Sequence, residues 1–277
     1  MKQRYPKHNF LAFPSMPKVS LLPILLFYLI YTTGEVVSDH RKIRIDDDVY
    51  CESWRFSVET NDAGYWSTIP ARCVQFVQDY MTGDQYRYDS EVVAENSVRF
   101  AKTVEISDSG SDGWVFDIDE TLLSNLPYYQ LHGFGSETFD EESFDSWVDL
   151  AEAPALPASL SLYKELKQLG FKIFLLTGRS EYQRNVTEKN LLYAGFTNWE
   201  RLILRYQAML QYIYRINKVG PSDQGKPAII YKSEKRSDLQ HEGYRIHGSS
   251  GDQWSDLLGF AVARRSFKLP NPMYYIS

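Results

Sequence analysis

The most informative segment of the chain is Trp114-Val115-Phe116-Asp117-Ile118-Asp119-Glu120-Thr121-Leu122-Leu123-Ser124. Its first three residues form an apolar run that is typical of a short buried strand. Alternation along a strand would put Asp117 and Asp119 on the same side, facing the crevice where parallel α/β sheets bind ligands. Two such carboxylates can bind a hard cation, or act as nucleophile and acid/base. A strand-ending turn with solvated aspartates is the alternative that this stretch alone leaves open.

The composition indicates a globular protein with a proper core. The chain has 277 residues, enough for one large domain or two small ones, and 43% of them are hydrophobic. The formal net charge is -6 and no stripe of basic residues stands out, so we expect no nucleic-acid partner. Any phosphate group must therefore be bound by a local site, because the overall charge would repel it.

The N-terminus has the pattern of a signal peptide. Four basic residues come before any acidic one, and an apolar run follows at residues 19–31 that is short for a transmembrane helix. We expect a signal peptide over residues 1–34, with cleavage near Gly34, and a secreted or vacuolar protein without stable membrane association. An uncleaved anchor and a buried core helix are the alternatives.

Two features agree with export. Cys51 and Cys73 would form a disulfide in an oxidising compartment, and two free buried thiols are the alternative. Asn185 begins the triplet Asn185-Val186-Thr187, an acceptor for N-glycosylation. Such triplets are common by chance, so this one gains weight only because the chain is predicted to be secreted.

Strand and helix patterns alternate along the rest of the chain. After the strand at 114–116, we expect strands at residues 171–176, 201–205, 244–247 and 267–269. Helices are expected at residues 80–106 with Asp89 as a candidate N-cap, at 160–169 and at 181–193, and residues 226–242 end in a helix. This order predicts an α/β fold, a Rossmann-like parallel sheet flanked by helices.

An acidic and aromatic segment, residues 130–157, interrupts the alternation directly after the first strand motif. An insertion at this point of an α/β fold hangs over the crevice, so we interpret the segment as a small helical cap that shapes access for a substrate. A surface excursion with an ordinary core-facing side is the alternative.

Reactive side chains follow several predicted strands or begin a helix. Because such ends meet on one side of a parallel sheet, we expect these side chains to converge. Carboxylates that bind Mg²⁺, with a hydroxyl and an ammonium group that bind phosphate oxygens, suit phosphoryl transfer. The residues concerned are Asp117 and Asp119, Thr177 with Gly178, Lys232, and Asp252 with Asp256.

The motifs around these residues resemble a known family. They are Phe116-Asp117-Ile118-Asp119-Glu120-Thr121-Leu122-Leu123-Ser124-Asn125, Leu175-Leu176-Thr177-Gly178-Arg179, Tyr231-Lys232-Ser233 and Gly251-Asp252-Gln253-Trp254-Ser255-Asp256-Leu257. In this order they are similar to the haloacid dehalogenase superfamily, and more narrowly to the plant acid phosphatase and vegetative storage protein family. The resemblance covers roughly residues 54–277, within an expected phosphatase domain at residues 50–277.

The resemblance implies a role for each residue. Asp117 would be the nucleophile that forms an aspartyl-phosphate, and Asp119 the general acid/base, with its backbone carbonyl on the metal. Thr177, Gly178 and Lys232 would bind the phosphoryl group. Asp252 would complete the Mg²⁺ shell together with Asp117, and Asp256 would be a nearby support or a water-mediated ligand.

The implied function is a Mg²⁺-dependent acid phosphatase that acts on small phosphomonoesters. The alternative is a storage protein of the same fold with weak or no catalysis. A membrane-anchored interaction protein is a weaker alternative, valid only if the N-terminal segment is retained. The many aromatic residues also make a homodimer reasonable.

One segment departs from the family pattern. Residues 206–219 lie between the strand at 201–205 and the third motif, where the family has almost no residues. A genuine surface helix or hairpin and a translated intron are the two alternatives for this segment. We predict that this segment has few contacts with the core, so its deletion should leave the free energy of unfolding unchanged in a denaturant titration. A large loss of stability after the deletion would contradict this prediction.

Overall fold

The computed structural model describes residues 46–206 and 223–276. The predicted signal peptide at 1–34 lies outside these residues, as does the segment at 206–219 except for Tyr206. Tyr206 and Asp223 flank the omitted segment and are paired: the Asp223 backbone N–H donates to the Tyr206 carbonyl at 2.8 Å. In the described part of the chain, no helix is long and apolar enough to cross a membrane.

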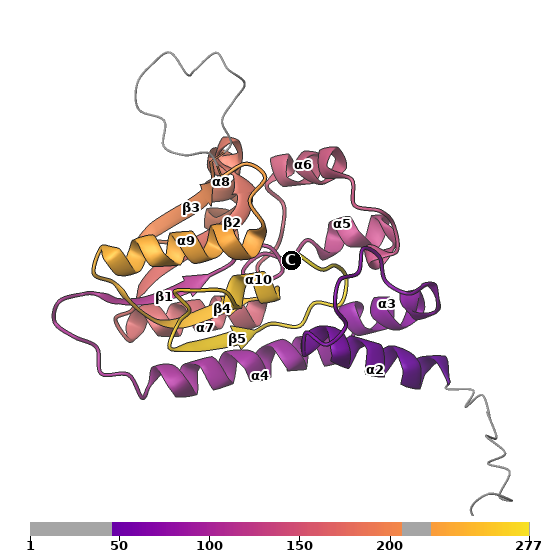
Figure 1. Ribbon diagram of the computed structural model, residues 1–277, viewed down its shortest axis with the longest axis horizontal. Coiled ribbons are helices and arrows are strands. Elements are labelled where there is room, and N and C mark those ends of the chain that lie inside the picture. Colours follow the sequence, from indigo (N-terminus) through magenta and orange to yellow (C-terminus); the bar gives the residue numbers. More distant parts are fainter. Residues whose placement is uncertain (1–45, 207–222, 277) are drawn as a thin grey trace, which may run out of the picture. The chain divides into compact units, whose positions relative to one another are not determined.

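A parallel sheet forms the centre of the fold (Figure 1). Its order is β3-β2-β1-β4-β5, and every neighbouring pair is parallel. The described strands are β1 (Asp112–Phe116), β2 (Lys172–Ser180), β3 (Arg201–Arg205), β4 (Arg245–Gly251) and β5 (Arg265–Lys268). The predicted fold class is thereby confirmed, and the first motif follows the central strand.

Helices cover both faces of the sheet. The described α-helices are α2 (Asp47–Glu59), α3 (Val74–Thr82), α4 (Asp84–Ala101), α5 (Leu126–Leu131), α6 (Glu141–Leu150), α7 (Pro157–Gln168), α8 (Arg184–Tyr193), α9 (Ala228–His241) and α10 (Trp254–Leu257). Short 3₁₀ turns are η1 (Ala71–Cys73), η2 (Gly133–Gly135) and η3 (Glu181–Gln183).

Alternation along β1 divides the core. Trp114 and Phe116 pack into a cluster with side chains of α4, α7 and α8, whereas Val115 packs with side chains of α9 on the opposite face. Next to Trp114, β4 must have a glycine, because a Cβ at Gly248 would lie 2.4 Å from the Trp114 ring. The Trp114 indole N–H donates to Ser250 Oγ at 3.0 Å and ties the same two strands together.

The predicted helix at residues 80–106 is two helices. Gly83 separates α3 from α4 with an extended ψ of 177°, and a Cβ there would lie 2.6 Å from the Asp79 carbonyl oxygen. The prediction of Asp89 as an N-cap was therefore wrong. Asp89 lies inside α4, where its carboxylate accepts a hydrogen bond from the Tyr80 hydroxyl at 2.7 Å across the break.

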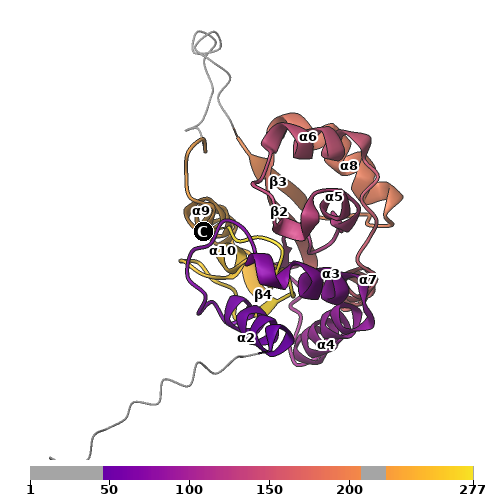
Figure 2. The ribbon, with the colours of Figure 1, turned by 90° about the vertical axis from the view of Figure 1, so that its right-hand side faces the viewer.

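The segment after the first motif is helical and comprises α5, η2 and α6, beginning a few residues before the expected 130–157 range. Figure 2 shows α5 beside α3. Tyr128 and Phe134 share a buried cluster with Val77 of α3 and with Met273 near the C-terminus. Gly135 touches this terminal segment closely, because a Cβ at Gly135 would overlap the Met273 carbonyl. The N-terminal helices and the C-terminal segment thus support the helical insert together.

Cys51 of α2 and Cys73 of η1 are fully buried and form a disulfide. The bond closes a loop with a sequence separation of 22 residues, which contains the turn region between α2 and η1. Such a cross-link stabilises a protein chiefly by restricting its unfolded chain.

We expect replacement of both cysteines by serine to lower the free energy of unfolding by about 3 kcal/mol, the scale for a loop of this size. Urea unfolding with and without reductant measures this effect. Reductant should destabilise the native protein and leave the double variant unchanged. An equal response of both proteins to reductant would contradict the prediction.

Candidate active site

The turn after β1 and the turn after β4 bring three carboxylates together. Asp117 follows β1 and its backbone N–H donates to the Ser250 carbonyl at 3.0 Å, so β1 and β4 stay paired up to the site. Asp252 follows β4 directly, and Asp256 lies in α10. Oxygen atoms of Asp117, Asp252 and Asp256 lie within 4.8 Å of one another, and all three residues are buried.

Lys232 supplies the positive charge that faces this cluster. It projects from α9, and its Nζ atom lies 2.6 Å from Asp117 Oδ1 and also contacts Asp256 Oδ1. Burial alone would lower the pKa of Lys232, but the charges of Asp117 and Asp256 outweigh burial and raise that pKa. Lys232 therefore stays protonated and holds both carboxylates in place.

One ammonium group does not balance three carboxylates. Burial, and next the charge of Asp256, raise the pKa of Asp117 well above its ordinary value despite Lys232. Burial and Asp256 also raise the pKa of Asp252 to about 6. Hard divalent cations such as Mg²⁺ prefer carboxylate oxygens, so these residues fit such an ion, and its charge would balance the excess.

Asp119 lies apart from the cluster, paired with a buried arginine. Arg179 Nη2 donates to Asp119 Oδ1 at 2.7 Å, and Arg179 Nε donates to Asp119 Oδ2 at 3.1 Å. Burial alone would raise the pKa of Asp119, but Arg179 and then Asn125 outweigh it and lower that pKa. Two aspartates that look equivalent in the sequence thus have opposite electrostatic environments.

Thr177 and Gly178 lie within the last residues of β2, which extends beyond the predicted strand. The Thr177 hydroxyl is buried and accepts a hydrogen bond from the Arg179 backbone N–H at 3.1 Å. Gly178 is exposed, and a Cβ there would meet no atom of the described chain within 4 Å. The backbone at Gly178 is therefore open to an incoming group.

Several buried residues of the site had no assigned role in the sequence analysis, among them Arg179, Glu120, Asn125 and Asn271. Glu120 has a left-handed φ of 49° and accepts hydrogen bonds from the Asn125 backbone N–H and the Tyr274 hydroxyl, both at 2.6 Å. Asn271 Nδ2 donates to Asp252 Oδ2 at 2.7 Å. The sequence signal for Glu120 and Asn125 was their position in the first motif. Asn271 is distant in sequence and was recognisable only as part of the C-terminal stretch.

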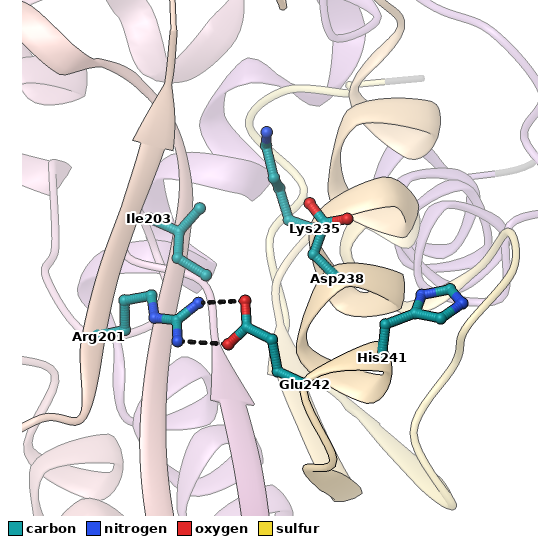
Figure 3. Close-up of a pocket in the computed structure, with 6 residues that line it drawn as sticks. All are labelled: Arg201, Ile203, Lys235, Asp238, His241 and Glu242. Carbon is teal, nitrogen blue, oxygen red and sulfur yellow. Dashed lines mark hydrogen bonds and ion pairs between the residues drawn. The ribbon is translucent and has the colours of Figure 1, made fainter. Parts of the chain in front are cut away.

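The predicted glycosylation site and a surface pocket both lie away from the carboxylate cluster. Asn185 is exposed in the first turn of α8. A pocket between β3 and α9 is lined by residues that include Arg201 and Glu242, which are joined by two hydrogen bonds (Figure 3). Arg201 begins β3 and Glu242 follows the end of α9, so this pocket is at the amino end of the strands, opposite the carboxylates.

The raised pKa values predict how stability depends on pH. Burial, and next the charge of Asp252, raise the pKa of Glu120 from 4.5 to about 8. Between these values the folded state binds more protons than the unfolded state, so stability falls as pH rises. We expect the protein in chelator to have a smaller free energy of unfolding at about pH 8 than at about pH 5.

Glu120→Gln should shrink this difference by roughly 3 kcal/mol, because the amide does not ionise. Denaturant titrations at both pH values measure it. Glu105→Gln, at an exposed glutamate, is the matched control and should leave the difference unchanged. An undiminished difference in Glu120→Gln would show that Glu120 is already ionised in the folded protein at the lower pH.

Comparisons with known proteins agree with this geometry. The family model for HAD superfamily, subfamily IIIB (Acid phosphatase) matches residues 38–277. Acid phosphatase 1 of Solanum lycopersicum is 50% identical over 87% of this chain and 89% of its own length. Vegetative storage protein 2 of Arabidopsis thaliana is 38% identical over 82% of this chain and 80% of its own.

A solved structure shares the fold. The class C acid phosphatase from Bacillus anthracis superposes with a TM-score of 0.56 at 22% identity, over 73% of this chain and 84% of that one. At this identity the likeness concerns the fold alone. Membership of the family follows from the family model and the plant relatives: this chain belongs to the acid phosphatases of HAD superfamily subfamily IIIB.

Proposed function

We propose that this acid phosphatase family member hydrolyses small phosphomonoesters through an aspartyl-phosphate on Asp117, with Mg²⁺ as its cofactor. The observation that carries the proposal is the position of Asp117, which follows the central strand, contacts Lys232 and lies within 4.8 Å of two further carboxylates. A buried carboxylate held by an ammonium group at a strand end has a defined direction of attack, as phosphoryl transfer requires.

In the first step, a carboxylate oxygen of Asp117 attacks the phosphorus atom of the ester. The bond from phosphorus to the ester oxygen breaks, its electron pair stays on that oxygen, and Asp119 gives the oxygen a proton so that an alcohol leaves. In the second step, a water oxygen attacks the phosphorus and gives a proton to Asp119. The bond from phosphorus to Asp117 breaks, which restores the carboxylate and releases inorganic phosphate.

The proton donor must be protonated before the first step. Arg179 lowers the pKa of Asp119 in the substrate-free site. A bound phosphate group brings negative charge close to both residues, and a nearby negative charge raises the pKa of a carboxyl group. Substrate binding and an acidic medium therefore both favour the protonated form of Asp119, as an acid phosphatase requires.

The remaining groups bind the phosphoryl oxygens and the metal. We assign Lys232, Thr177 and the backbone at Gly178 to the phosphoryl group. Mg²⁺ would be held by carboxylates of Asp117 and Asp252 and by the Asp119 carbonyl, with Asp256 in direct or water-mediated contact, and it would neutralise charge on the phosphoryl oxygens. We also propose that α5 and α6 act as a cap that shapes access to the site.

A storage role is the second candidate, because one relative is named a vegetative storage protein. Accumulation as a store of amino acids needs no buried Lys232–Asp117 pair, and an unused buried ion pair stabilises a fold little. The intact pair therefore favours catalysis, and one chain can serve both roles.

The Cys51–Cys73 disulfide supports a secreted or vacuolar location after removal of residues 1–34, with Asn185 accessible for glycosylation.

The proposal predicts the effect of removing the nucleophile. Asp117→Asn should lower kcat for an aryl phosphate by about 10³ or more, because an amide oxygen does not form the covalent intermediate. Hydrolysis of p-nitrophenyl phosphate between about pH 4 and about pH 8, with Mg²⁺ or with chelator, measures this. Chelator should also abolish the wild-type activity.

Asp108→Asn is the matched control, since Asp108 is exposed in the loop before β1. It should keep wild-type activity and metal dependence. Activity of Asp117→Asn equal to that of the wild type would exclude the aspartyl-phosphate mechanism. A wild type without phosphatase activity at any of these pH values would favour the storage role.

A further inference from the structure

Asn125 connects the helical insert to Asp119. It is fully buried and lies at the N-cap position of α5, where asparagine usually accepts a hydrogen bond from the backbone of the helix. Here the side chain does not cap the helix; the Leu126 backbone N–H instead donates to Ser124 Oγ at 3.2 Å. The amide of Asn125 is therefore available for the active site.

The amide joins the turn after β1 to α6 through three side chains. Its Nδ2 donates to Asp119 Oδ1 at 2.9 Å and to Glu120 Oε2 at 3.2 Å. Its Oδ1 accepts from the indole N–H of Trp147, on α6, at 2.9 Å. Because an indole N–H can only donate, it determines which end of the amide faces α6, and so directs the NH₂ group at Asp119.

This contact makes the two oxygens of Asp119 unequal. Oδ1 accepts hydrogen bonds from Asn125 Nδ2, Arg179 Nη2 and Arg179 Nε, whereas Oδ2 accepts only from Arg179 Nε, at 3.1 Å, among the described residues. An oxygen with three donors has little remaining capacity to carry a proton. Oδ2 is therefore the oxygen that can take a proton and give it away.

We propose that Asn125 is a positioning residue that presents Asp119 Oδ2 for proton transfer, and that Trp147 orients Asn125. The position of α6 thereby controls the hydrolysis of esters with poor leaving groups. The inference rests on the proposed function, in which Asp119 protonates the leaving oxygen. It deepens that function by naming the substrate class that depends on the insert: alkyl phosphates, whose alkoxide needs a proton as the phosphorus–oxygen bond breaks. Nitrophenolate is a better leaving group than an alkoxide and departs without being protonated.

The test compares kcat/KM for glycerol phosphate with kcat/KM for p-nitrophenyl phosphate in the full chain. For each ester, kcat/KM reports only the steps up to release of the alcohol. The later step, in which water gives a proton to Asp119, therefore does not affect kcat/KM. Trp147→Phe keeps the ring but removes the N–H, and should lower kcat/KM about tenfold for glycerol phosphate, with at most about a twofold change for p-nitrophenyl phosphate. Asn125→Ala should show the same selectivity with a loss of about 10²-fold.

Trp66→Phe is the matched control. Trp66 is also half-buried, but its indole N–H has no hydrogen-bond partner among the described residues, so its removal should change neither constant. Thermal midpoints of the three variants show that each one folds. A loss of equal size on both esters in Trp147→Phe would overturn the inference, since it would indicate a structural role only.

Asp119→Asn and Asp117→Asn separate this inference from the proposed function. If Asp117→Asn is inactive and Asp119→Asn is selectively impaired on glycerol phosphate, the proposed function holds. If Trp147→Phe and Trp66→Phe then have the same kcat/KM values for both esters, the positioning role is overturned and the proposed function stands. If Asp117→Asn remains active, the proposed function fails and the inference fails with it.

Discussion

The contact of Lys232 with Asp117 and Asp256 is the interaction on which the arrangement of the site depends. All three side chains are buried, and burying a charge is costly unless an opposite charge lies against it. Lys232 comes from α9, whereas the carboxylates come from the end of β1 and from α10, so one ion-pair group joins elements far apart in the sequence. Among the described residues no cation pairs with Asp252, which accepts hydrogen bonds from Asn271, Gln253 and Thr121. The resulting excess of negative charge is what makes the site suitable for a divalent cation.

A second, separate pairing gives the other aspartate of the motif a different environment. Arg179 and Asn125 hold Asp119 away from the carboxylate cluster, although only Ile118 separates it from Asp117. Directly after Asp119 the chain turns, and Glu120 takes a left-handed conformation there. Neutral polar side chains then connect Asp119 to the helical insert through Trp147, and Glu120 to the C-terminal segment through Tyr274. The proposed proton donor is thus linked to the proposed cap, and the proposed nucleophile to the sheet.

Much of the fold was predictable because its signals are local. Apolar runs identified the strands, and the βα alternation identified a parallel sheet, since strands joined by helices pair in parallel. The boundaries failed where backbone conformation or a hydrogen-bond partner, rather than the hydrophobic pattern, decided them. Gly83 ends α3 and α4 begins at once, and Asp89 turns to Tyr80 rather than capping a helix. β4 extends beyond the predicted strand because its last residues pair with β5. β2 also extends beyond its predicted end, but there the register with β3 breaks after Leu176 and pairing resumes only at Ser180.

The reactive groups, and the order of the elements that carry them, could be read from the amino-acid sequence. Acidic residues after strands, a hydroxyl-glycine pair and a lysine in a helix are local features, and a parallel sheet brings strand ends to one edge whatever the details of packing. Only the tertiary structure decided which charges meet. It paired Lys232 with Asp117 and Asp256, and it placed Arg179 on Asp119. It also recruited Asn125, Trp147 and Asn271, because a buried polar atom must find its partner in space and no spacing along the chain specifies that partner.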